Sequence, residues 1–206
     1  MKKVFALITA FLMCLSLCAC GGGKSADNLA LGQTASTDLV DFTLENSEFT
    51  YYVSNVSTNF VEPTDEPNSL FAASLGHCYV SATFTITNKD RGGSISVGGE
   101  GKPVWSVSYN KTDYPVKGYD PNSPSGWGGL NLGQNAAILN KTTNTVIKVN
   151  ETTNYLLDAG ETVTIRTFGV VDVDPENLTD GFDLTISIPN SKSERENFTY
   201  TIPAQN

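Results

Sequence analysis

Histidine is almost absent from this chain of 206 residues, since His77 is the only one. A Ser-His-Asp triad needs a histidine as its general base, and catalytic zinc sites commonly use several. The sequence therefore argues against His-based nucleophilic catalysis and against a multi-histidine metal site. His77 directly precedes an apolar strand pattern, so we interpret it as a residue at the start of a strand. No catalytic residue, metal or cofactor is predicted.

Cysteine is also scarce, and it is concentrated at the N-terminus. Cys14, Cys18 and Cys20 lie within the first twenty residues, and Cys78 is the only cysteine beyond them. If residues 1–19 are removed and Cys20 is modified, no intramolecular disulfide can form. The domain must then be stabilised by its core alone. Cys78 lies within an apolar strand pattern and is predicted to be a buried packing residue.

Basic residues are too few to balance the acidic ones. The chain has 13 Lys and Arg against 22 Asp and Glu, which gives a formal net charge of −9. The acids are spread along the sequence, which is typical of a solvated surface. An acidic surface disfavours nucleic acid as a partner. Sequence spacing does not exclude a pair of facing carboxylates, so a carboxylate-based hydrolase acting on surface polysaccharide is the alternative hypothesis.

Long apolar runs are missing apart from one near the N-terminus. The run from Val4 to Leu17 follows Lys2 and Lys3 and is shorter than the roughly 20 residues of a membrane span. A positive start, a short apolar segment and a small residue before the cleavage point are the parts of a secretory signal. We predict that residues 1–19 are a signal peptide.

The apolar run ends in Leu17-Cys18-Ala19-Cys20, a motif that resembles the lipobox of bacterial lipoproteins. The resemblance implies cleavage before Cys20, lipidation of Cys20, and attachment to the extracellular face of the bacterial cell membrane. Residues 20–38 contain few large apolar side chains, so we expect a flexible tether there. At about 3.3 Å per residue, this tether could lift the domain a few tens of ångströms off the bilayer. Residues 39–206 are predicted to form one domain.

Beyond the tether the sequence indicates an all-β domain. Between His77 and Asn88, apolar residues such as Val80 and Phe84 alternate with serine and threonine, which is typical of a half-buried antiparallel strand. Further strands are predicted at residues 48–58, 104–109, 112–117, 145–149, 161–171, 182–188 and 197–202, with loops at 61–76 and 118–135. Asn110-Lys111 is predicted to be a hairpin turn. Short strands separated by turn residues favour an antiparallel β-sandwich.

Three of these segments resemble the DUF4352-type domains of Gram-positive lipoproteins. They are the strand Tyr79–Lys89, the turn and strand Leu157–Val163, and the strand Phe182–Ile188. Ala159 stands where that family usually has proline. The resemblance covers roughly Asn46 to Asn190 and implies an immunoglobulin-like β-sandwich with a binding or structural role. It brings no catalytic residues with it.

Aromatic residues between positions 105 and 127 supply the candidate binding site. Trp105, Tyr109, Tyr114, Tyr119 and Trp127 are close in sequence, and Trp127 lies in a glycine-rich loop. Exposed aromatic rings are enriched at binding interfaces. We predict ligand binding by Tyr114, Tyr119 and Trp127; in the alternative interpretation, Trp105 and Tyr109 belong to the core and Trp127 closes one end of the sandwich.

Acidic residues between positions 172 and 183 suggest a further alternative, because carboxylates gathered in one loop could bind Ca²⁺. This segment lacks the EF-hand pattern, and its Asp-Pro and Asp-Gly pairs are also ordinary turn residues. The leading hypothesis is a non-enzymatic, lipid-anchored module that contacts a surface protein, a glycan or the cell wall.

Overall fold

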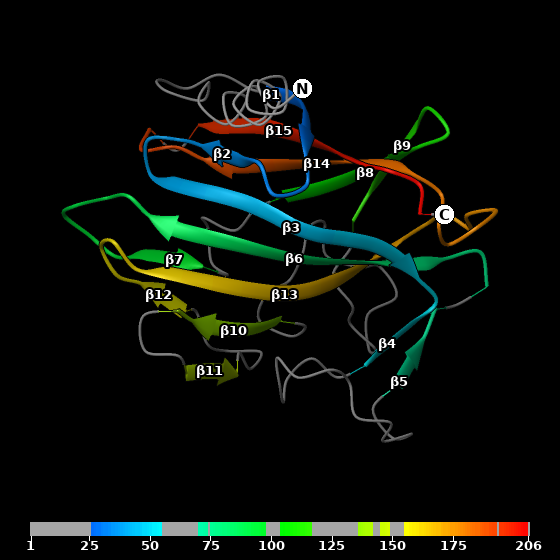
Figure 1. Ribbon diagram of the computed structural model, residues 1–206, viewed down its shortest axis with the longest axis horizontal. Coiled ribbons are helices and arrows are strands. Elements are labelled where there is room, and N and C mark those ends of the chain that lie inside the picture. The colour runs from blue at the N-terminus through cyan, green and yellow to red at the C-terminus, as the bar shows by residue number, and fades with distance from the viewer. Residues whose placement is uncertain are drawn as a thin grey trace, which may run out of the picture.

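The computed structural model describes residues 26–54, 70–73, 75–97, 104–116, 136–141, 145–148, 155–192 and 194–205, and all their regular elements are strands (Figure 1). Within these ranges there is no helix with the length and apolar character needed to cross a membrane.

Two large sheets make up the molecule. The five-stranded sheet has the order β1 (Ala26–Ala30), β15 (Arg195–Ile202), β14 (Phe182–Pro189), β8 (Val104–Tyr109), β9 (Thr112–Pro115). The six-stranded sheet has the order β11 (Thr145–Lys148), β10 (Ala136–Asn140), β13 (Thr162–Val171), β6 (Cys78–Asn88), β3 (Val40–Thr50), β2 (Thr34–Ser36). Two short pairs complete the described strands: β7 (Ile95–Val97) with β12 (Tyr155–Leu157), and β4 (Tyr52–Ser54) with β5 (Leu70–Ala72).

The strand order is that of an immunoglobulin-like sandwich. In an immunoglobulin domain, strands A, B, E and D form one sheet, and strands G, F, C and C′ form the other. The main strands β3, β6, β8, β9, β10, β13, β14 and β15 take the places of A, B, C, C′, D, E, F and G in chain order. The predicted all-β, immunoglobulin-like antiparallel sandwich is therefore confirmed.

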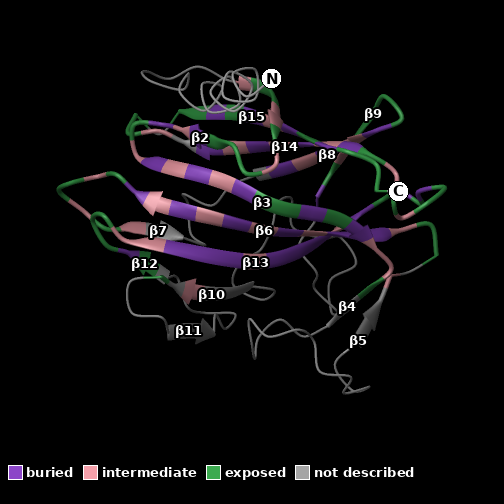
Figure 2. Cartoon of the chain, viewed as in Figure 1, coloured by how far each residue is buried: buried purple, intermediate pink, exposed green. Residues whose placement is uncertain are grey.

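The alternating pattern of β6 produces one apolar and one polar face, as predicted. Val80 and Phe84 are buried between the sheets, whereas Ser81 and Thr85 are half-buried on the outer face (Figure 2). Threonine hydroxyls from neighbouring strands lie within hydrogen-bond distance of each other on this outer face. The pairs are Thr34–Thr43 at 2.8 Å, Thr85–Thr164 at 3.2 Å and Thr87–Thr162 at 2.9 Å.

The hairpin between β8 and β9 is also confirmed. Tyr109 pairs with Thr112, so the loop has two residues, Asn110 and Lys111. Both have positive φ, 49° and 65° respectively. Two positive φ values are the mark of a type I′ turn, whose twist matches that of the flanking strands.

Aromatic side chains join the two sheets at the centre of the core. Trp105 on β8 packs against Phe84 on β6 and Phe42 on β3, with ring centroids 5.5 Å and 6.2 Å apart. In antibody domains a buried tryptophan on strand C packs against an inter-sheet disulfide. Here Phe84 and Phe42 provide the surface on which Trp105 packs. Cys78 is buried as a free thiol, as predicted.

The predicted tether over residues 20–38 is wrong in its C-terminal part. Residues 26–30 form β1, which pairs in parallel with β15, and residues 34–36 form β2, which pairs with β3. Leu29 and Leu31 pack against the core, and the Tyr200 hydroxyl donates to the carbonyl of Gln33 at 3.0 Å. Residues 26–38, which the prediction assigned to the tether, therefore belong to the sandwich.

Candidate interaction surface

The predicted site residues are distributed unequally over the described structure. Cys20, Tyr119 and Trp127 lie outside the described residues. Tyr114 lies on β9, opposite Val107 of β8, where it is half-buried and packs against the core.

Trp105 and Tyr109 belong to the core, as the alternative interpretation of the aromatic cluster held. Trp105 is 1% exposed and Tyr109 is 6% exposed. The Tyr109 hydroxyl donates to Asp180 at 2.5 Å and accepts from the backbone N–H of Glu176 at 3.2 Å. Through these two hydrogen bonds, Tyr109 links the connection between β13 and β14 to the end of β8.

Carboxylates in the β13–β14 connection, residues 172–181, bond to different strands. Asp172 lies 3.3 Å from Nε2 of His77, next to β6, and Asp174 accepts from the Tyr51 hydroxyl, just after β3, at 2.7 Å. Asp180 accepts from Tyr109 on β8. These carboxylates serve as acceptors that hold the connection in place. Among the described residues, no group of three or more His, Cys, Asp or Glu side chains is arranged to hold a metal ion.

These hydrogen bonds shift the proton affinities of the groups that make them. The hydrogen bond to Asp174 raises the pKa of Tyr51 to about 12, because the phenol loses a charged acceptor when it ionises. The hydrogen bonds from Tyr109 and from the N–H of Asn177 lower the pKa of Asp180, because both donors stabilise its charged form.

His77 lies directly before β6, close to the predicted position at the start of a strand. Its Nδ1 lies 3.0 Å from the carbonyl oxygen of Leu75, while Nε2 faces Asp172. The next residue, Cys78, is 0% exposed, and burial raises its pKa to about 12. The thiol is therefore a packing group here, not a nucleophile.

A few large apolar side chains are exposed to solvent. Three large apolar residues of the described chain are exposed: Leu75 at 98%, Tyr52 at 63% and Leu156 at 59%. Leu75 lies in the turn before β6, and Tyr52 lies on β4, opposite Ala72 of β5. Leu156 lies elsewhere, on β12.

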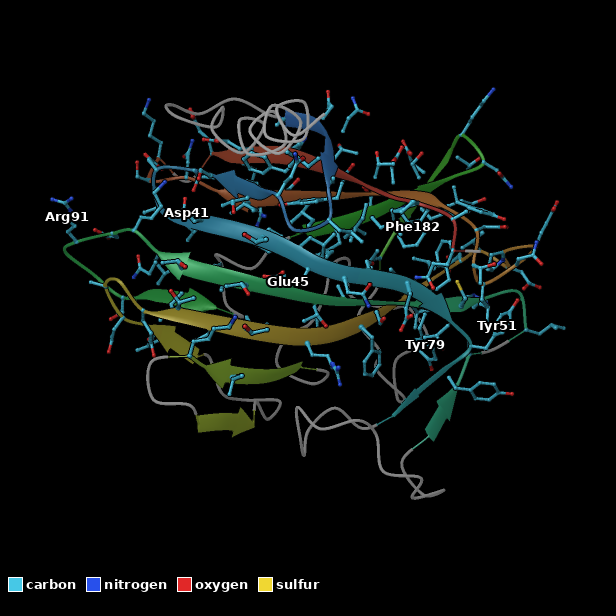
Figure 3. The ribbon with its side chains drawn as sticks, viewed as in Figure 1. Asp41, Glu45, Tyr51, Tyr79, Arg91 and Phe182 are labelled. Atoms are coloured by element: carbon cyan, nitrogen blue, oxygen red, sulfur yellow. The ribbon has the colours of Figure 1, made fainter. Side chains whose placement is uncertain are left out.

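Tyr51 lies at one end of the sandwich, and Arg91 lies at the opposite end (Figure 3). The strands β4 and β5 lie on the far side of the molecule from β1 (Figure 1). Sequence reasoning missed Leu75; the available signal was an apolar residue directly before Gly76, in a segment otherwise predicted to be a loop.

Comparison with known proteins finds a similar fold but identifies no family. No protein-family model matches the chain, and no curated protein matches it either. A solved structure is similar: an uncharacterised β-sandwich protein from Clostridium difficile 630, with a TM-score of 0.50 and 15% sequence identity. The match covers 88% of this chain and 97% of that one. At this identity, the likeness shows the fold alone.

Proposed function

We propose that this protein is a lipid-anchored, non-enzymatic binding module on the extracellular face of a bacterial cell membrane. Its sandwich would present loops to a surface protein, a glycan or the cell wall. Binding residues are commonly found on loops held by a rigid scaffold, and an immunoglobulin-like sandwich is such a scaffold. The resemblance to DUF4352-type domains supports the same role.

The observation that carries the proposal is the position at which the chain enters the fold. β1 begins at Ala26, so only residues 21–25 separate the lipobox Cys20 from the five-stranded sheet. A fully extended chain of this length reaches about 20 Å. A lipidated Cys20 would therefore hold the β1 edge of the sandwich next to the bilayer, closer than the longer tether expected from sequence.

Fatty-acid labelling of cells tests the anchor. Cells that produce the full chain are fed an alkyne-tagged fatty acid, and the protein is isolated and examined for the tag. Cys20→Ser should abolish labelling, because it removes the only sulfur at the lipobox cleavage point. Cys18→Ser is the matched control and should retain labelling. Labelling that survives Cys20→Ser, or is lost in both variants, contradicts the proposal.

Capture from the cell surface fraction tests the binding role and the predicted aromatic loop. The mature chain serves as bait, and Trp127→Ala is compared with the native sequence. A hot-spot tryptophan contributes about 2 kcal/mol or more, so its loss should weaken binding by at least about thirtyfold. Equal capture by a folded Trp127→Ala variant would move the binding site away from Trp127 and Tyr119.

A further inference from the structure

We propose that β1 is a releasable strap. It detaches from β15 as a unit, pivots at Gly32, and lengthens the connection between the membrane and a sandwich that otherwise stays folded. The gain in reach rests on the proposed lipid anchor at Cys20. The detachment itself does not, because it depends on the contacts of β1 and of the turn that follows it.

The pairing of β1 with its sheet is weak. β1 stands at the edge of the five-stranded sheet, next to β15 (Figure 1). The pairing is parallel, which is the less stable arrangement per residue, and its register shifts between Ala26 and Leu29. Within this interval Asn28 has a φ of 62°, a left-handed conformation that costs energy even though asparagine tolerates it better than most residues. Such a strand opens at a lower free energy than the strands at the centre of a sheet.

Little side-chain burial opposes the detachment of β1. Three of its five residues are exposed, and the other two, Ala26 and Leu29, are only partly buried against the core. On β2, by contrast, Ala35 is 3% exposed and belongs to the core. Because apolar burial is the main stabilising contribution, the boundary between a releasable and a fixed segment falls between these two strands.

The turn between β1 and β2 supplies the pivot. Gly32 has a φ of 80°, and its N–H donates to the carbonyl of Leu44 on β3 at 2.8 Å. The carbonyl of the next residue, Gln33, accepts from the Tyr200 hydroxyl on β15 at 3.0 Å. These two hydrogen bonds hold the turn to both sheets. Detachment that starts at Ala26 therefore stops at Gly32.

Detachment changes how far the sandwich can stand from the bilayer. With β1 paired, residues 21–25 connect Cys20 to the fold and reach about 20 Å when extended. With β1 released, the connection runs to Gly32 and reaches about 40 Å. A partner that holds the sandwich beyond the shorter distance favours the released state, because only that state accommodates the longer one. Binding and strap release are then coupled.

A removable disulfide between β1 and β15 tests the strap. Ala30 and Thr201 are paired and both exposed, so Ala30→Cys with Thr201→Cys can link the strands in a chain of residues 20–206 with Cys20→Ser. Hydrogen exchange followed by mass spectrometry measures the protection of each strand. In the native sequence and in the reduced variant, we expect the amides of β1 to exchange at least about a hundredfold faster than the slowest amides of β6. Oxidation should slow exchange in β1 by about tenfold or more.

The edge strand β9 is the control, because the disulfide does not touch it and its exchange should be equal in the oxidised and reduced forms. Exchange in β1 as slow as in β6 would overturn the inference, because β1 would then open only with the whole sandwich. Exchange at the rate of an unstructured peptide would also overturn it, because β1 would not be docked. If β2 exchanged together with β1, the pivot would not be Gly32. None of these measurements involves lipid, so the strap and the proposed anchor fail independently.

Discussion

Trp105 stabilises this sandwich because its ring is buried between the two sheets. It is 1% exposed, and it contacts Phe84 and Phe42 from the opposite sheet. Its indole Nε1 has no hydrogen-bond partner, so the side chain contributes through packing area and ring contacts. A tryptophan ring that could have served in binding instead fills the space between β8, β6 and β3.

Trp105→Ala is expected to lower the free energy of unfolding by about 3–5 kcal/mol, because it removes a large buried ring and leaves a cavity. Trp105→Phe should cost less, because phenylalanine keeps part of the ring contact and removes the unpaired indole N–H. Urea denaturation followed by far-UV circular dichroism measures both. Leu156→Ala, at an exposed position, should change little. A loss below about 1 kcal/mol in Trp105→Ala would contradict a central packing role.

Asp180 makes the fold sensitive to acid. Its carboxylate accepts from Tyr109 and from the Asn177 N–H, and these bonds lower its pKa in the folded state. A carboxyl group with a depressed folded-state pKa stabilises the protein at pH values above its unfolded pKa, about 3.9. That contribution is lost as the pH falls through the folded-state value.

Asp180→Asn should therefore lower the thermal midpoint at pH 7 and flatten its decline below about pH 4. Thermal scans between pH 7 and pH 2 measure the effect. Asp113→Asn, at an exposed position on β9, is the matched control. Parallel curves for the native chain and Asp180→Asn would show that the Tyr109–Asp180 bond contributes nothing to acid sensitivity.

Among the elements, the β8–β9 hairpin follows from its sequence most directly. Asparagine adopts positive φ more readily than most residues, but Lys111 at φ 65° carries the cost of a left-handed conformation. Glycine at that position relieves the cost. Since both turn residues are exposed, the change stays local.

Lys111→Gly is expected to raise the free energy of unfolding by about 0.5–1 kcal/mol, because Asn-Gly is a preferred type I′ sequence. Gly76→Ala tests the opposite direction: its φ of 80° should make the variant about 1 kcal/mol less stable. Urea midpoints measure both changes. A destabilised Lys111→Gly would show that the lysine side chain makes a contact worth more than its backbone strain.

Central strands were predictable from sequence because both of their faces follow one period. β6 alternates from Val80 to Thr87 without interruption, and it lies between two partners. β3 was placed too late in the chain because its alternation changes phase. Leu44 pairs with Phe84 and Asn46 pairs with Thr83, so Glu45 is an extra bulge residue (Figure 3). A bulge moves every later side chain to the other face, which hides a strand from a search for period two.

The edge strands β1 and β2 were missed for a different reason. β1 is short, contains Asn28 at a φ of 62°, and pairs irregularly with β15. It carries no alternating pattern, so its composition resembles that of a linker. Its place in the sheet depends on contacts from distant residues, such as the bond from Tyr200 to Gln33. Only the tertiary fold distinguishes such a segment from a tether.

Removal of residues 21–31 should therefore lower the urea midpoint, whereas removal of residues 21–25 should leave it nearly unchanged. Leu31→Ala tests the same point without a deletion. Its side chain is partly buried against the core, so the expected loss is about 1 kcal/mol. Equal midpoints for the two truncated chains would mean that β1 contributes no stability.

At the scale of the whole molecule, residue type alone did not predict which side chains the fold leaves exposed. Trp105 and Tyr109 belong to the aromatic cluster from which the binding residues Tyr114, Tyr119 and Trp127 were predicted, yet both lie in the core, as the alternative interpretation held. Leu75 was not selected, because leucine is ordinary in sequence and unusual only when the fold leaves it uncovered. The direction in which a side chain points depends on strand register and turn geometry, and these are tertiary properties.

Within the described residues no disulfide joins the two sheets, and the free thiol of Cys78 allows the stability of the packed core to be measured. In a chain of residues 20–206 with Cys20→Ser, Cys78 is the only thiol. It is 0% exposed, and burial raises its pKa to about 12, so a thiol reagent at pH 8 should not react with the native state.

Reaction requires an opening that exposes the start of β6 in the centre of the six-stranded sheet. The free energy of that opening, obtained from labelling rates in increasing urea, should equal the free energy of global unfolding. Dithiothreitol should leave the urea midpoint unchanged, because there is no disulfide to reduce. Rapid labelling in the absence of urea would show that this end of β6 opens locally, and the interlocked aromatic core would then stabilise only the other end of the sandwich.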